Sequence, residues 1–323
     1  MNSNWFTFGV VTVIASLCVT QANSNEPNGT RASAADPMHG KEAGEVRADN
    51  ALKMKFVWCS PGVVTMENVE TTTVRAAGNE NLNKPKSDDE FELQVEPAPG
   101  PRLTPEITPV KAFLTRGYWL GKYEVTQSEW TRVMKTEPWT GSNFVRAGAD
   151  FPATCVDWGD ATEFCRKLTE QERQAGRLSD GWEYTLPTEA QWERACRARS
   201  ETRFSFGDDE SKLVDHAWFS NNAGGVGELF AHRAGQRTAN AWGLCDMHGN
   251  VWEWCRDAYT TKLPGGRDPE VKRDDIPGNL YRVTRGGSWS DDAARCRSAN
   301  RGWGSPTNWG NGLGFRVALS AVR

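Results

Sequence analysis

The apolar positions along the chain predict short strands separated by irregular segments. A strand-like run covers residues 54–59, and a denser run over residues 113–125 predicts one or two further strands. After about Arg199 the helical periodicity fades, and short apolar pieces alternate with turns rich in Gly, Asn, Asp and Pro. The pattern therefore favours an irregular α+β core with little regular secondary structure.

Three short helices are predicted where a capping residue precedes an amphipathic stretch. Thr126 with Glu129, and Thr188 with Gln191, have the spacing of capping boxes, in which each side chain satisfies an unpaired backbone N–H at the helix start. Asp157 is expected to cap the helix that lies between these two in the sequence. The apolar positions at helical spacing should face the core; they are Trp130, Val133 and Met134, then Ala161, Phe164, Cys165 and Leu168, and finally Trp192, Ala195 and Cys196.

The longest apolar run lies at the N-terminus, over residues 5–20. It is shorter than the ~20 residues of a bilayer span. Thr20 and Ala22 also offer small residues for cleavage, so residues 1–22 are predicted to be a signal peptide. No Lys or Arg precedes the run, which leaves an uncleaved anchor as the alternative. We expect an exported protein, periplasmic or extracellular (secreted), with no membrane span in the mature chain.

Two polar stretches interrupt the remaining chain. Residues 23–52 contain almost no large apolar side chain and are predicted to be a flexible tether. A second such stretch, at about 67–109, is interpreted as a long insertion in a domain that covers residues 53–323, because the strand-like run at 54–59 precedes it. A structureless connection of this length is unusual, and the alternative is a domain that begins only near Val110.

Composition excludes several classes of protein. A net charge of −4 provides no broad basic surface for nucleic acid and no polybasic patch for acidic lipid. The chain has 15 Trp and 31 Gly, which favours a loop-rich fold held by large aromatic side chains. No phosphate-binding glycine loop, Ser nucleophile elbow or metal-type histidine spacing is present.

The clearest chemical pattern lies within residues 243–255. Asp246 and Glu253 flank a Gly249-Asn250 turn, and such a turn can direct carbonyl oxygens inward beside two carboxylates, as in a structural Ca²⁺ site. The spacing alone leaves open that both carboxylates only accept hydrogen bonds from the turn. The predicted calcium ligands are Asp246, Gly249, Val251 and Glu253.

Five segments in order resemble the formylglycine-generating enzyme (sulfatase-modifying factor) superfamily. They are YWLGKYEVT at 118–126, LPTEAQWE at 186–193, GNVWEW at 249–254, RGGSW at 285–289 and LGFR at 313–316. The resemblance covers about residues 54–323 and implies a C-type-lectin-like α+β fold. It also implies calcium at the four predicted ligands, and a disulfide between Cys196 and Cys296. A Cys245–Cys255 bridge is a further possibility.

The resemblance argues against the superfamily's copper chemistry in this chain. The oxidases hold copper with two cysteines, five residues apart, after the Gly-Gly-Ser-aromatic segment. Here the first position is Asp291, and Cys296 falls either at the second position or at a later structural cysteine, so there is no pair. One thiolate cannot supply the two-thiolate coordination that Cu(I) favours.

We therefore expect an exported module that binds a peptide or glycan, or serves a structural role, without acting as a copper oxidase. Aromatic side chains flanked by amides suit such ligands, and the predicted binding residues are Ser288, Trp289, Trp303, Asn308 and Trp309. The alternative is a formylglycine-generating oxidase that uses copper to convert a sulfatase cysteine to formylglycine. Its candidate catalytic residues are Cys296 and Ser288.

Overall fold

The structure is a computed structural model, which describes residue 1, residue 36 and residues 38–322 apart from 68–108, 276–277 and 279–280. The chain divides into two units, Met1–Asp36 and Pro37–Arg323. The predicted signal peptide at 1–22 lies almost wholly outside the described residues. Among those that are described, no helix is both long and apolar enough to cross a bilayer.

The centre of the second unit is a five-stranded antiparallel sheet with the order β1-β2-β5-β12-β6. Its strands are β1 (Val46–Arg47), β2 (Phe56–Cys59), β5 (Tyr118–Gly121), β12 (Ala318–Ala321) and β6 (Trp182–Thr185). All four residues of β2 and of β5 are buried. Because side chains alternate across a strand, Phe56 and Trp58 enter one core cluster, while Val57 and Cys59 enter another.

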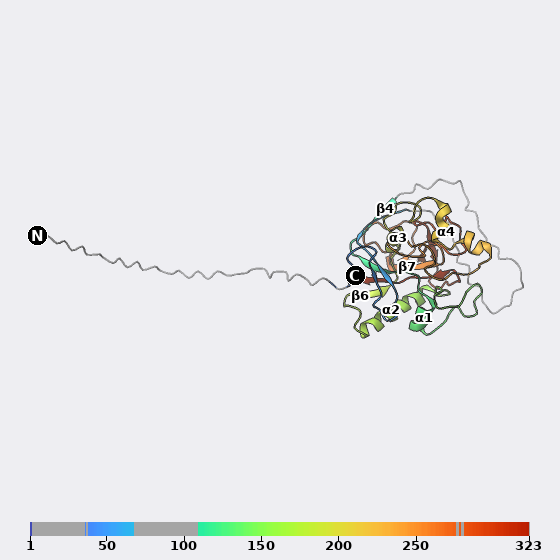
Figure 1. Cartoon of the computed structure of the whole chain (residues 1–323), viewed down its shortest axis with the longest axis horizontal. Coiled ribbons are helices and arrows are strands. Elements are labelled where there is room, and N and C mark those ends of the chain that lie inside the picture. Colours follow the sequence, from blue (N-terminus) through green and yellow to red (C-terminus); the bar gives the residue numbers. More distant parts are fainter. Residues whose placement is uncertain (2–35, 37, 68–108, 276–277, 279–280, 323) are drawn as a thin grey trace. The chain divides into compact units, whose positions relative to one another are not determined.

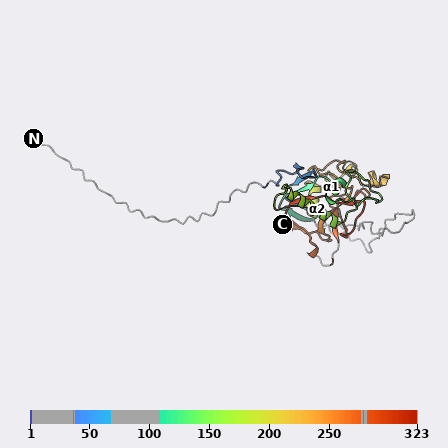
Figure 2. The same cartoon turned by 90° about the horizontal axis from the view of Figure 1, so that it is seen from below.

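Helices cover both faces of this sheet. The helices α1 (Gln127–Met134) and α2 (Trp158–Gln174) contribute to the first core cluster, and α3 (Glu189–Arg197) contributes to the second. In Figure 1, α1 and α2 lie together at one edge of the domain and α3 lies nearer its centre, and Figure 2 shows the α1–α2 side from below. Each helix starts at its predicted cap: Thr126 and Thr188 form complete capping boxes, and Asp157 accepts a hydrogen bond from the Asp160 N–H.

Two smaller sheets and several short helices complete the described fold. One sheet has the order β10-β9-β7-β11 and the other β3-β4-β8. The strands are β10 (Arg301–Gly304), β9 (Arg282–Arg285), β7 (Trp252–Ala258), β11 (Leu313–Gly314), β3 (Gly62–Glu67), β4 (Pro109–Leu114) and β8 (Gly266–Arg267). The short helices are η1 (Glu210–Lys212), α4 (Leu213–His216), η2 (Ser220–Asn222), η3 (Gly224–Val226) and η4 (Arg273–Asp275). The low content of regular secondary structure agrees with the sequence pattern.

The predicted tether at 23–52 is wrong in its second half. Met38 and Asn50 are buried, and β1 pairs with β2 in the central sheet. The Asn50 side chain accepts hydrogen bonds from two backbone N–H groups and donates one to the Met54 carbonyl, so a polar stretch is ordered by bonds that hydropathy does not register. Residues 68–108 lie outside the described part, but β3 and β4 pair so that Glu67 faces Pro109.

Candidate functional site

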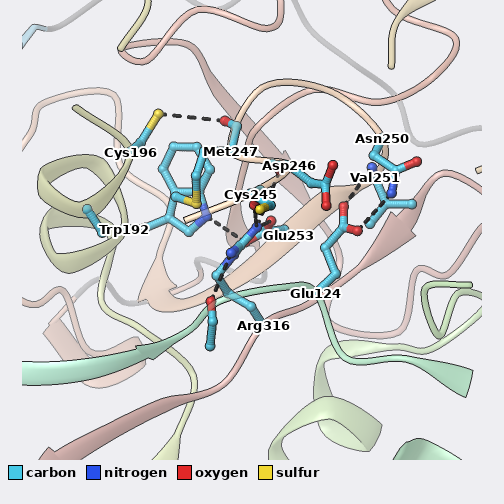
Figure 3. A network of polar contacts seen from close by, with 12 residues as sticks. Glu124, Trp192, Cys196, Cys245, Asp246, Met247, Asn250, Val251, Glu253 and Arg316 are labelled. Carbon is cyan, nitrogen blue, oxygen red and sulfur yellow. Dashed lines mark hydrogen bonds and ion pairs between the residues drawn. The ribbon is translucent and has the colours of Figure 1, made fainter. Parts of the chain in front are cut away.

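Three acidic side chains from distant segments meet in the interior of the domain, as Figure 3 shows. Glu124 follows β5, Asp246 lies in the loop before β7, and Glu253 lies in β7; each is at most 2% exposed. The guanidinium of Arg316 donates to both Glu253 oxygens, from Nε and from Nη2, at 2.6 Å each. The indole N–H of Trp192 also donates to Glu253, at 2.6 Å.

A left-handed turn brings Asp246 into this group. Asp246, Gly249 and Asn250 all have positive φ angles, and a Cβ on Gly249 would lie 2.1 Å from the Trp218 carbonyl oxygen. Only glycine fits such a close backbone approach. The turn also places the Asn250 amide so that it donates to Glu124 at 2.8 Å.

The cluster carries more negative charge than its one paired guanidinium balances. Burial, together with the neighbouring carboxylates, raises the pKa of Glu124 well above its usual value and that of Asp246 to about 6. Asp246 accepts from the Gly235 N–H through Oδ2, whereas its buried Oδ1 has no hydrogen-bond partner. An unpaired buried carboxylate oxygen calls for a proton or a cation.

The two carboxylates among the predicted calcium ligands lie in the same cluster, but they differ in how many of their oxygens are already bonded. Asp246 keeps an unengaged oxygen, whereas both oxygens of Glu253 are engaged by Arg316. Among the described residues, no group of three or more His, Cys, Asp or Glu side chains is arranged to hold a metal ion. Glu124 is not among the predicted site residues, although a charged residue inside the apolar 113–125 run is a signal that could have identified it.

A second polar centre surrounds Asp291, the residue at the position of the first copper cysteine. Its Oδ2 accepts from the Ser288 N–H at 3.0 Å, from the Ser288 hydroxyl at 2.5 Å and from the Trp252 indole at 2.8 Å. Burial raises the pKa of Asp291, although these three donors oppose the shift. The Ser288 hydroxyl also contacts that of the exposed Ser290 at 3.1 Å. The carboxylate is thus tied into the loop as a hydrogen-bond acceptor.

The predicted Cys196–Cys296 disulfide is absent from the structure. Both residues are buried free thiols, as are Cys245 and Cys255. The imidazole of His248 contacts both segments: its Nε2 lies 3.9 Å from Cys196 Sγ, and its Nδ1 is 2.7 Å from the Cys296 carbonyl oxygen. All seven cysteines of the described residues are buried and unpaired.

Two of the five predicted ligand-binding residues are buried. Ser288 and Trp289 are 2% and 6% exposed. Gly224 and Gly312 cover them: the Gly224 N–H donates to the Trp289 carbonyl at 3.1 Å, and a Cβ on Gly312 would lie 3.4 Å from Ser288 Cβ. The other three, Trp303, Asn308 and Trp309, are partly exposed. Trp303 packs against Tyr281, and Trp309 packs against the first core cluster.

Comparison with solved structures supports the fold. The chain is similar to Treponema denticola variable protein 1, with a TM-score of 0.60 and 23% identity over 85% of this chain and 98% of that one. It is also similar to PvdO from Pseudomonas aeruginosa, with a TM-score of 0.62 and 23% identity over 87% of this chain and all of that one. These likenesses confirm the predicted α+β architecture.

Curated relatives have several different names. Chaperone protein LppX of Paenibacillus barcinonensis is 27% identical over 63% of this chain and 80% of its own length. The formylglycine-generating enzyme of Bos taurus is 29% identical over 52% of this chain and 44% of its own. The inactive Cα-formylglycine-generating enzyme 2 of Mus musculus is 30% identical over 55% of this chain and 52% of its own. The chain thus spans about half the length of each of these two formylglycine-generating relatives.

The profile of the sulfatase-modifying factor enzyme 1-like domain matches residues 47–321, which include all five motif segments. The described strands β1 to β12 all lie within that range, apart from the first residue of β1. The chain belongs to the family of sulfatase-modifying factor enzyme 1-like domains.

Proposed function

We propose that this chain is an exported member of the family that binds unfolded or extended polypeptide and does not act as a copper oxidase. The observation that argues against oxidase activity is Asp291, whose carboxylate is held by Ser288 and Trp252 where the superfamily's oxidases have a thiol. Export rests on the N-terminal apolar run alone.

Copper chemistry lacks a suitable donor set around Asp291. Cys296 is fully buried, and burial, with the nearby carboxylates, raises the pKa of its thiol well above the usual value. Metal binding and nucleophilic reactivity need the thiolate, and Cu(I) favours two soft ligands. A relative named as inactive is consistent with a member of the family that lacks the oxidase activity.

Loops from four parts of the chain meet around Trp289. Gly224 donates to the Trp289 carbonyl, the Trp289 indole donates to the Asn311 carbonyl, and the Asn311 amide donates to the Asn143 carbonyl. These loops and the segment that follows η3 carry three exposed apolar side chains. Phe144 is 51% exposed, Val226 is 63% exposed and Leu229 is 40% exposed. We infer that these three side chains belong to one surface, and an exposed apolar surface is typical of interaction sites.

The chemistry of this surface favours a polypeptide over a glycan. Its exposed members are one aromatic and two aliphatic side chains, and aliphatic groups bind apolar side chains but stack poorly on sugar rings. The similarity to a protein named as a chaperone is consistent with a polypeptide ligand. Trp303, Asn308 and Trp309 remain available as partly exposed contacts.

Binding can be tested with the full chain and reduced, carboxymethylated α-lactalbumin, a permanently unfolded polypeptide, by fluorescence anisotropy. Val226→Asp should weaken binding about tenfold or more, because burying a valine contributes about 1.5 kcal/mol or more and each 1.4 kcal/mol is a factor of ten. The matched control is Val63→Asp, at an exposed valine of β3 that is 47% exposed. Equal loss in both variants, or binding only to a glycan array, would contradict the proposal.

The oxidase alternative has a separate readout. The full chain, Cu(I), oxygen and a reductant are incubated with a cysteine-containing sulfatase peptide, and the aldehyde is sought by mass spectrometry, with an active formylglycine-generating enzyme as positive control. We expect no conversion. Aldehyde formation by the wild-type chain would establish the alternative instead.

We also propose that Asp246 holds a structural Ca²⁺ through its unengaged Oδ1, aided by main-chain oxygens of the 249–251 turn and by Glu124, whose oxygens accept from neutral donors, the Asn250 amide and the Val251 N–H. The unengaged Asp246 Oδ1 and the excess buried negative charge support this. Ca²⁺ should raise the melting temperature of the wild-type chain, and Asp246→Asn should abolish that increase. An unchanged melting temperature with Ca²⁺ or chelator would contradict calcium binding.

A further inference from the structure

A cavity of about 230 Å³ lies beside the outer strand of the central sheet, and it shares no lining residue with either polar centre described above. Strand alternation explains its position. In β6, Trp182 and Tyr184 point into the first core cluster, so Glu183 faces the other side of the sheet, where Ser320 of β12 pairs with it. On that side the cover is incomplete, and the space is lined by polar side chains from α3, β7 and the β8–η4 segment.

Both signs of charge line this cavity. Arg256 of β7 is paired with Glu270, through Nε at 2.7 Å and Nη2 at 2.8 Å, which neutralises both groups. Asp268 accepts from the backbone and hydroxyl of Thr115. The Arg256–Glu270 pair is thus neutral and builds the wall, whereas Asp268 is held in place by Thr115 and keeps its negative charge.

Two other charges in the lining remain without a bonded partner. Among the described residues, neither the Glu183 carboxylate nor the Lys272 ammonium takes part in a hydrogen bond or ion pair. Arg116 uses its guanidinium for one bond, to the Val322 carbonyl at 3.2 Å. Beside the anchored Asp268, the cavity therefore offers the Glu183 carboxylate and at least one cation to a ligand.

Neutral polar groups lie between these charges. The Gln191 amide reaches the Ser320 hydroxyl at only 3.4 Å, and both residues are at most 9% exposed. A contact this long is weak, so either group gains by bonding to a ligand. Such convergent polar groups in a concave site are typical of small-molecule recognition.

The volume limits the size of that ligand. Pockets for drug-sized molecules span roughly 300–1,000 Å³, and this cavity is smaller. A small ligand that presents an ammonium to Glu183 and a carboxylate to the exposed Lys272 and Arg116 would match this volume and these charges. We propose that this cavity binds a free amino acid in its zwitterionic form.

The test is isothermal titration of the full chain with individual L-amino acids at low ionic strength, and L-alanine provides the charge analysis. Propionate lacks its ammonium and ethylamine lacks its carboxylate, so each should bind about tenfold or more weakly than L-alanine, as for the loss of one charged hydrogen bond. Glu183→Gln should reduce the affinity for L-alanine and leave that for propionate unchanged. Lys272→Gln should reduce the affinity for L-alanine and leave that for ethylamine unchanged.

Matched controls are Glu201→Gln and Lys55→Gln, which change exposed charges outside the cavity and should bind L-alanine as the wild type does. Circular dichroism and a melting curve establish that each variant is folded. The proposal is overturned if no L-amino acid binds the wild type, or if Glu183→Gln affects L-alanine no more than Glu201→Gln does. Its failure would leave the polypeptide-binding proposal intact, because Val226→Asp reports on different residues.

Discussion

The strongest stability prediction concerns the Glu253–Arg316 pair at the centre of Figure 3. Both side chains are 0% exposed, so water cannot replace a lost partner. Removing one member of a buried pair typically costs about 3–5 kcal/mol, because the other charge stays buried without compensation. Glu253→Gln should cost about 3 kcal/mol of unfolding free energy, since Asp246 and Glu124 remain close to the guanidinium. Arg316→Met should cost about 5 kcal/mol of unfolding free energy, since three buried carboxylates would lose their shared cation.

Urea unfolding of the single and double variants gives the free energies and, through a double-mutant cycle, the coupling energy of the pair. We expect a coupling of about 3 kcal/mol. The control pair is Arg166–Glu170 on α2, whose side chains are both 53% exposed; Glu170→Gln should cost no more than about 0.5 kcal/mol. If Glu253→Gln were no more destabilising than Glu170→Gln, the description of Glu253 as a dry, fully engaged carboxylate would be refuted.

Three further predictions concern backbone strain, protonation and thiol state. Gly249→Ala should destabilise the chain by more than about 2 kcal/mol in urea unfolding, whereas Gly227→Ala, at a similar positive φ but with open space around it, should cost clearly less; equal losses would mean that the Trp218 contact is unimportant. Because burial raises the folded-state pKa of Asp246 to about 6, from 3.8, the folded chain binds the extra proton, so stability without Ca²⁺ should fall as pH rises from about 4 to about 6. Asp246→Asn should reduce that slope, and an unchanged slope would assign it to other groups. The native protein should react slowly with a thiol reagent, because the cysteines of the described residues are buried. After denaturation without reductant, every cysteine should react; a number of reactive thiols two below the number of cysteines would indicate a disulfide.

Local sequence signals predicted the helices accurately because each depends on neighbouring residues. The capping boxes at Thr126 and Thr188 need only a partner three positions away, and both are present. The buried positions followed for the same reason: Trp192 and Cys196, spaced four residues apart on α3, are fully buried. The strand-like run before Cys59 likewise formed β2.

The sites were harder to predict because their contacts join distant segments. Nothing near Asp291 in the sequence shows that Trp252 donates to it. Ser288 and Trp289 looked available for a ligand, but loops at Gly224 and Gly312 close over them, and that closure is a property of the fold. The exposed apolar side chains Phe144, Val226 and Leu229 were not predicted as one surface, because Phe144 lies far from the other two in the sequence.

The structure explains why the motifs predicted the family and not the activity. Glu193 pairs with Arg285, Trp192 donates to Glu253, and Glu253 pairs with Arg316. These contacts join four of the five motif segments to one another, so the residues that carry the resemblance form the buried polar framework of the fold. The oxidase chemistry would depend instead on positions 291 and 296, which lie outside every motif. A chain can therefore match all five motifs with an acid at position 291, and its function has to be tested at that loop and at the cavity beside β6.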